Sequence, residues 1–221
     1  MKADELYALI GRWRKEMEEA GKMGCVAEMG QVMLELREDM YVSEQKSAGK
    51  SGKAIVSAAK RIVKSAKAAN RDNISGVFAN IDKDGTEHWC VCDLYVGVRF
   101  NEPMPLEEVD TSKCAPFDMS QFCRMPDNAK ELDLPSLAEV KLYAKTNMVT
   151  GDRKGSTKLK PMKIDAEIGL WVNPKLLINI MECLPNAKAW GTTRMGVIYF
   201  KADNGDGVLM PVNYEEKELN K

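Results

Sequence analysis

The order of the predicted elements is repeated within this chain, and that order constrains its fold more than any other feature. The first series is a helix followed by strands, at 54–69, 74–82 and 88–100. The second series is a strand, a helix and three strands, at 162–172, 174–184, 187–193, 195–203 and 208–212. Alternating apolar residues indicate the strands, and apolar residues three and four apart indicate the helices. A helix followed by an antiparallel meander, used twice, predicts an α+β fold with two helices on one face of an antiparallel sheet.

The helix expected at 54–69 separates apolar and basic side chains on opposite faces. Its apolar face is formed by Ile55, Ala59, Ile62 and Ala66. The other face continues into a basic row that lies within roughly 60° around the axis, namely Lys53, Lys60, Lys64, Lys67 and Arg71. Like charges four residues apart repel, so helix stability does not explain the row. A polyanion crossing the helix would explain it, and a solvated lysine face is the plain alternative.

Charge is segregated along the chain, although the net charge is only −1. Residues 47–72 carry seven basic side chains and one acidic one, and residues 151–163 carry five and one. The remaining segments are each acidic on balance. Two compact basic segments in an otherwise acidic chain are typical of a protein that meets a polyanion at one place. This contrast favours the binding interpretation of the basic row.

The chain is expected to have four parts. They are a helical hairpin at 1–46, a polar linker at 47–53, an α+β domain at 54–214 and a polar tail at 215–221. Amphipathic helices at 4–19 and 25–41, separated by two glycines, would form the hairpin. A pair of short helices buries little apolar surface by itself. We therefore expect the hairpin to dock on the main body or on another subunit.

Three segments of the α+β domain carry a family resemblance. The sequences VNPKLLINIMECLPNAKAW (172–190) and MGVIYFKADNGDGVLMPV (195–212) resemble the closing half of a bacterial DNA sliding clamp domain, the β subunit of the replicative polymerase. The segment HWCVCDLYVGVRF (88–100) resembles the strand–Asp–bulky–strand segment of that family. The resemblance covers residues 54–214 and implies a single clamp-like domain. Clamp rings of this family contain about six such domains, so a ring would require several copies of this chain.

The resemblance implies a DNA-binding surface without catalysis. Sliding clamps hold double-stranded DNA non-specifically through basic helices that line a channel, which would place the basic row in that channel. Basic residues of the 151–163 loop would add to it, among them Arg153, Lys154 and Lys158. The second helix departs from the pattern, because its outward row of Lys175, Asn179, Glu182 and Asn186 is nearly neutral.

The resemblance also implies a site for a polymerase or another replication protein. Clamps receive short peptide motifs in an apolar groove near the carboxyl end of the domain. The residues placed there in this sequence are Leu209, Met210, Pro211 and Val212. The plain alternative is that these four residues form a last core strand.

The histidine and cysteine content gives little support for an enzyme or a metal centre. His88, Cys90 and Cys92 share one face of a predicted strand, and zinc ligation with Cys114 or Cys123 can be drawn. The usual C-x2-C pair is missing, however, and reduced cysteines are often small buried apolar residues. His88 is also the only histidine available for nucleophilic catalysis. We therefore expect no metal, no cofactor and no catalytic site.

The sequence indicates a cytosolic location, because no apolar run approaches the ~20 residues of a membrane span and the start lacks a signal peptide's apolar stretch. Three interpretations stay open. The first is a non-catalytic, clamp-like, DNA-associated homo-oligomer. The second is a protein-binding adaptor with a clamp-like fold that does not encircle DNA. The third is an enzyme whose site is not visible in the sequence.

Overall fold

The computed structural model describes residues 2–49, 51–112, 115, 117–150, 157–165 and 167–214. Its helices are α1 (Ala3–Glu19), α2 (Met23–Ser47), α3 (Gly52–Ala68), α4 (Leu137–Thr146) and α5 (Pro174–Cys183), with a 3-10 turn η1 (Asp72–Ile74). Its strands are β1 (Phe78–Ile81), β2 (Glu87–Cys92), β3 (Val96–Phe100), β4 (Lys130–Leu132), β5 (Met148–Thr150), β6 (Thr157–Leu159), β7 (Met162–Asp165), β8 (Leu170–Val172), β9 (Lys188–Gly191), β10 (Ile198–Ala202) and β11 (Gly205–Leu209).

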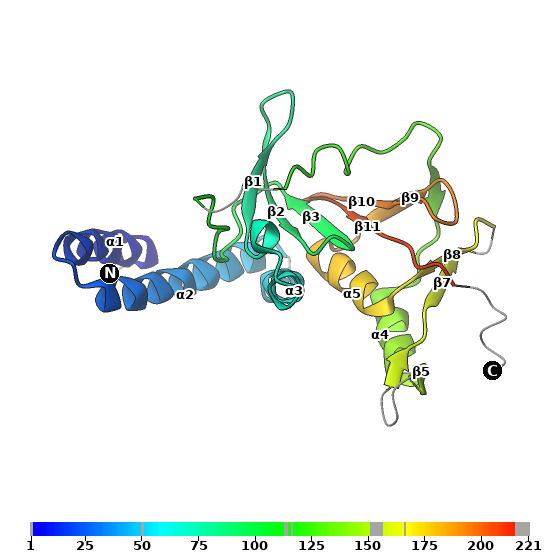
Figure 1. Cartoon of the computed structure of the whole chain (residues 1–221), viewed down its shortest axis with the longest axis horizontal. Helices are drawn as coiled ribbons and strands as arrows, with labels where there is room; N and C mark the ends of the chain where they lie inside the picture. Colours follow the sequence, from blue (N-terminus) through cyan, green and yellow to red (C-terminus); the bar gives the residue numbers. More distant parts are fainter. Residues whose placement is uncertain are drawn as a thin grey trace.

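The centre of the molecule is a seven-stranded antiparallel sheet in the order β1-β2-β3-β11-β10-β9-β4 (Figure 1). Helix α3 precedes the meander β1-β2-β3, and α5 precedes the meander β9-β10-β11. The two meanders meet where β3 pairs with β11, and Val98 lies opposite Gly207 at the middle of this seam. On the next strands outward, Val91 of β2 lies opposite Val98, and Phe200 of β10 lies opposite Gly207. The predicted α+β class and the twofold use of a helix and a meander are therefore confirmed.

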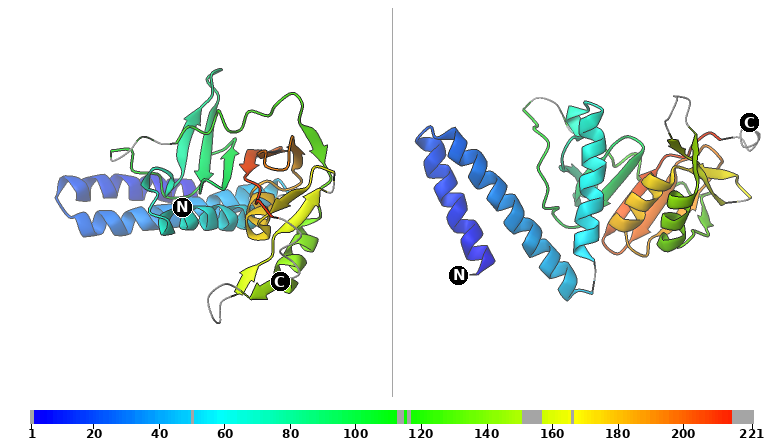
Figure 2. Two further views of the ribbon diagram at one scale, coloured as in Figure 1. Left: turned by 45° about the vertical axis from the view of Figure 1, so that its right-hand side comes forward. Right: turned by 90° about the horizontal axis from the view of Figure 1, so that it is seen from below.

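Helices α3 and α5 pack side by side on one face of this sheet, and α4 packs against the other side of α5 (Figures 1 and 2). We call these three helices the helix layer. The buried residues of α5 recur every three positions, at Pro174, Leu177, Ile180 and Cys183. A β-carbon on Gly207 would lie 3.2 Å from Cδ1 of Ile180. Glycine at the seam therefore lets α5 lie close against the sheet.

The opposite side of the sheet, which we call the outer face, has a smaller apolar cluster of its own. Strand residues Phe78, Cys90 and Val208 meet Met119 there. Met119 belongs to the long connection between β3 and β4, which passes over this side of the sheet (Figure 1). The connection begins by pairing beside β1, since a parallel bridge joins Val77 to Glu108. Both faces of the sheet are thus partly covered.

The linker expected at 47–53 is shorter in the structure than the sequence indicated. Helix α2 continues to Ser47 and α3 begins at Gly52, so only four residues separate the two helices. Gln45, near the end of α2, is buried and donates to Glu102 Oε2 at 3.0 Å. A β-carbon on Gly52 would lie 2.8 Å from that of Gln45. Glycine is needed because the two helices turn sharply against each other.

The hairpin of α1 and α2 projects from the rest of the molecule (Figures 1 and 2). The first helix packs mainly on α2, and Ile10 is its most buried residue. Trp13 and Val32 keep 46% and 44% of their surface exposed. The carboxyl-terminal half of α2 packs beside α3 and joins the main core through Tyr41. Helix α2 therefore docks on the chain's own body, which is one of the two expected docking modes.

Two smaller segments differ from the sequence expectation. The single strand expected at 162–172 is divided into β7 and β8, which pair with each other in a separate two-stranded sheet. The irregular segment 111–135 contains the three-residue edge strand β4, which pairs with β9. The expected helix at 137–146 is present as α4, and Ser136 caps it by accepting from the Glu139 backbone amide. Among the described residues, none of the helices is long and apolar enough to cross a bilayer.

Candidate nucleic-acid interface and apolar groove

The helix layer and the hairpin carry opposite charge. Helix α3 has five basic side chains and no acidic one. Helices α4 and α5 together have three basic and two acidic side chains. The hairpin helices α1 and α2 have five basic and ten acidic side chains. A negative hairpin therefore lies beside a positive helix layer.

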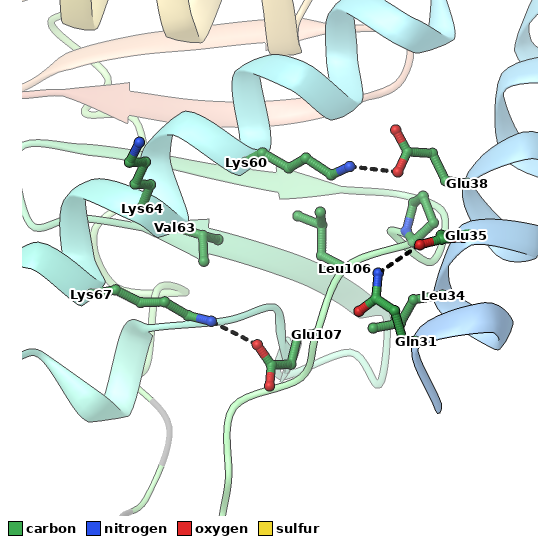
Figure 3. Close-up of a pocket in the computed structure, with 11 residues that line it drawn as sticks. Gln31, Leu34, Glu35, Glu38, Lys60, Val63, Lys64, Lys67, Leu106 and Glu107 are labelled. Carbon is green, nitrogen blue, oxygen red and sulfur yellow. Dashed lines mark hydrogen bonds and ion pairs between the residues drawn. The ribbon is translucent and has the colours of Figure 1, made fainter. Parts of the chain in front are cut away.

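The basic row expected on α3 does not form one free surface. Lys60 Nζ lies 2.5 Å from Glu38 Oε2 of α2, and Lys67 Nζ lies 2.6 Å from Glu107 Oε2 of the β3–β4 connection. Figure 3 shows these two lysines reaching toward carboxylates on the same side of the helix, while Lys64 between them points away from both carboxylates. Two of the five expected cations are thus neutralised within the chain.

Arg71 does not belong to the helix row. Helix α3 ends at Ala68, and Asn70 has a left-handed φ of 52° that turns the chain away from the helix axis. The Arg71 guanidinium donates to the Asp93 carbonyl oxygen and lies 5.4 Å from the centroid of the Tyr95 ring. The expectation that Arg71 extends the row is wrong, because the helical spacing stops before that residue.

The row keeps two exposed lysines, Lys53 at its start and Lys64 beyond Lys60. Both side chains are exposed, and neither has an ion-pair partner within the part of the chain that the structure describes. Arg61, which lies outside the expected row, faces α5, where its Nε donates to Asn179 Oδ1 at 2.8 Å. The same guanidinium pairs with Glu182, which also accepts Lys141 of α4 at 2.6 Å.

The positions expected in the basic loop are only partly described. Arg153 and Lys154 lie outside the described residues. Lys158 lies on β6, opposite Val149 of β5, in a two-stranded sheet separate from the central one. Nothing in the described part of the loop brings Lys158 onto α3.

An apolar groove of about 230 Å³ lies on the outer face. Its lining includes Leu94, Tyr95, Phe117, Met119, Phe122 and Met210. Phe117 and Phe122 come from the β3–β4 connection and stack with their ring centroids 5.1 Å apart. Leu94, Tyr95 and Phe122 keep 46–56% of their surface exposed. An apolar hollow with exposed aromatic rims is suited to an apolar side chain of a partner.

The four residues expected to bind a partner divide between the core and the surface. Leu209 is fully buried on the helix side, so it is a core residue. Met210 is exposed and lines the groove. Pro211 and Val212 are half-buried, and the Val212 amide donates to the Trp171 carbonyl oxygen at 2.7 Å. Aromatic residues in the irregular segment 111–135 were the sequence signal for the groove, and their significance is clear only in the fold.

His88, Cys90 and Cys92 lie on one face of β2, as their spacing predicted. His88 Nε2 lies 3.4 Å from Asp82 Oδ2. Burial raises the pKa of the Cys90 thiol well above its usual range and that of Cys92 to about 11. Cys114 lies outside the described residues. Within the described ranges, no cluster of three His, Cys, Asp or Glu residues is placed to hold a metal ion.

A buried arginine occupies the centre of this part of the sheet. Arg99 of β3 makes two parallel bonds of 2.7 Å to Asp206 of β11 and a third of 2.7 Å to Asp82. Its side chain is 7% exposed. These three bonds go to strand and turn residues of the chain itself, and those to Asp206 join the two meanders across their seam.

Comparison of the chain with family models, with curated proteins and with solved structures gives no match.

Proposed function

We propose that this chain is a non-catalytic, DNA-associated protein with the architecture of a single sliding-clamp domain, which holds double-stranded DNA non-specifically and tethers a replication partner. The duplicated helix and meander, with two helices side by side on one face of the sheet, is the arrangement expected from the clamp resemblance. Its helix layer carries eight basic and two acidic side chains. That charge supports contact with phosphates.

The observation that carries the proposal is the pair of exposed lysines on the outward side of α3. Lys53 and Lys64 lie between the α2 side, where Lys60 pairs with Glu38, and the α5 side, where Arg61 pairs with Glu182. Lysines on the exposed side of a helix contact phosphates without reading base edges. With about two phosphate contacts, the logarithm of the binding constant should fall with a slope of about −2 against the logarithm of salt concentration.

The proposed assembly is a homo-oligomer, because one chain supplies one such domain. The edge strands of the central sheet are β1 and β4, at opposite ends of the strand order. In this proposal the apolar groove receives a side chain of a polymerase or another replication protein. Met210 is the part of the expected partner segment that lines the groove.

The pairing of Lys60 and Lys67 with carboxylates favours a second candidate, a protein-binding adaptor that does not encircle DNA. In this candidate the helix layer has too few free cations for DNA, and the apolar groove and the hairpin are the working surfaces. The two candidates differ in one measurement, which is DNA affinity at low salt.

The test is titration of fluorescent duplex DNA, followed by anisotropy, with the variant Lys53→Glu, Lys64→Glu. We expect weak binding by the wild-type chain at about 50 mM salt and its loss in the variant. The matched control is Lys15→Glu, Lys22→Glu, which makes the same charge change on exposed hairpin residues. Equal binding by both double variants and the wild type would refute the proposed interface. A wild-type chain that does not bind at low salt would favour the adaptor.

A further inference from the structure

A cleft of about 420 Å³ separates α2 from the basic row (Figure 3). Apolar side chains form its floor, with Leu34 from α2, Val63 from α3 and Leu106 from the β3–β4 connection. Acidic and amide side chains of α2 line one wall, and lysines of α3 line the other. The two walls are joined where Glu38 meets Lys60.

The two ion pairs in this region share a geometry. In each pair the lysine belongs to α3, and the carboxylate comes from a segment that packs on the same flank of that helix. The lysine side chains are about half exposed, at 51% for Lys60 and 49% for Lys67. Exposed pairs of this kind contribute little to folding stability. Their larger effect is on the local potential, because each carboxylate cancels one positive charge at the edge of the row.

From this geometry we infer that Glu38 and Glu107 set the edge and the strength of the proposed DNA interface, by neutralising Lys60 and Lys67 and so confining phosphate contacts to the unpaired lysines on the outward side of α3. This inference rests on the proposed function. It assigns the hairpin a role in that function, as an acidic wall beside the DNA path. A polyanion would then contact Lys53 and Lys64 and would stay away from the acidic α2 wall of the cleft.

The packing of α2 does not depend on the two carboxylates. Tyr41 of α2 is buried in the main core together with Ile55 of α3, and the floor of the cleft is apolar. Replacing Glu38 and Glu107 with glutamine removes charge and keeps side-chain shape. The variant should therefore keep the hairpin in place, which circular dichroism and the urea midpoint can verify.

The experiment measures duplex DNA affinity against salt for the wild-type chain and for Glu38→Gln, Glu107→Gln. Two freed lysines should steepen the salt slope by about 1.8, since each phosphate contact adds about 0.9 for B-form DNA. Between about 50 and 200 mM salt, the variant should therefore lose about 12-fold more affinity than the wild type. Each single variant should show about half of the change in slope.

The matched control is Glu35→Gln. Glu35 lines the same cleft from the same helix but accepts from Gln31 and has no ion pair to a lysine among the described residues. We expect its slope to equal that of the wild type. A wild-type chain that binds DNA, with the same slope in the double variant, would overturn this inference and leave the proposed function standing. Absence of DNA binding in both the wild type and the double variant at about 50 mM salt would overturn both.

Discussion

The buried guanidinium of Arg99 offers a sharp test of how the two meanders are held together. Arg99 and Asp206 lie directly opposite each other on β3 and β11, the two strands that form the seam. Replacing Asp206 with alanine removes two of the three 2.7 Å bonds made by Arg99 and leaves only the bond to Asp82. The arginine then stays buried with an incomplete set of acceptors.

The expected loss is about 3 kcal/mol in the free energy of unfolding. Breaking a buried ion pair by removing one partner typically destabilises by about 3–5 kcal/mol. The lower end applies here because the Asp206 side chain is 28% exposed and Asp82 remains. Arg99→Met should be less damaging, at about 1–2 kcal/mol, since both carboxylates can then reach water and the aliphatic volume is retained.

Urea unfolding of the four species in the double-mutant cycle measures the coupling. If the free energy of unfolding falls by about 2–3 kcal/mol per molar urea, Asp206→Ala should lower the urea midpoint by roughly 1 M. In the double variant the two losses should be less than additive by about 2 kcal/mol, because the orphaned arginine is gone. Additive losses would show that Arg99 and Asp206 do not stabilise the seam as a pair.

Two further predictions follow from the buried thiols and Tyr41. Iodoacetamide should modify exposed Cys25 rapidly in the native protein and leave Cys90, Cys92 and Cys183 unmodified, because burial raises the pKa of these three thiols. Peptide mass spectrometry measures the modification of each cysteine. Fast modification of Cys183 would contradict the prediction. Burial, followed by the charge of Glu102, raises the pKa of Tyr41 to about 12. Because the folded state keeps these groups protonated while the unfolded chain ionises them, the free energy of unfolding should fall as the pH rises above about 9. An unchanged urea midpoint between about pH 8 and pH 10.5 would contradict the assigned burial.

The sequence by itself determined the elements that have a strong period. The apolar spacing of Ile55, Ala59 and Ile62 was sufficient to place α3, and alternation was sufficient to place β2 and β10. Such patterns are local, because a side chain's face on a helix or strand depends on its spacing from its neighbours. The order of these elements then limited the fold to two meanders with a helix each, which is the observed topology.

Only the tertiary structure decided which cations of α3 are free. Glu38 and Glu107 lie 22 and 40 residues from the lysines that they neutralise, and no periodicity in the chain links them. The apolar groove also depends on contacts between distant segments, since the sheet and the connection that covers it bring Phe122 and Met210 together. Contacts between distant segments depend on how the elements pack, so charge compensation and concave surfaces are properties of the folded chain and cannot be obtained from local pattern.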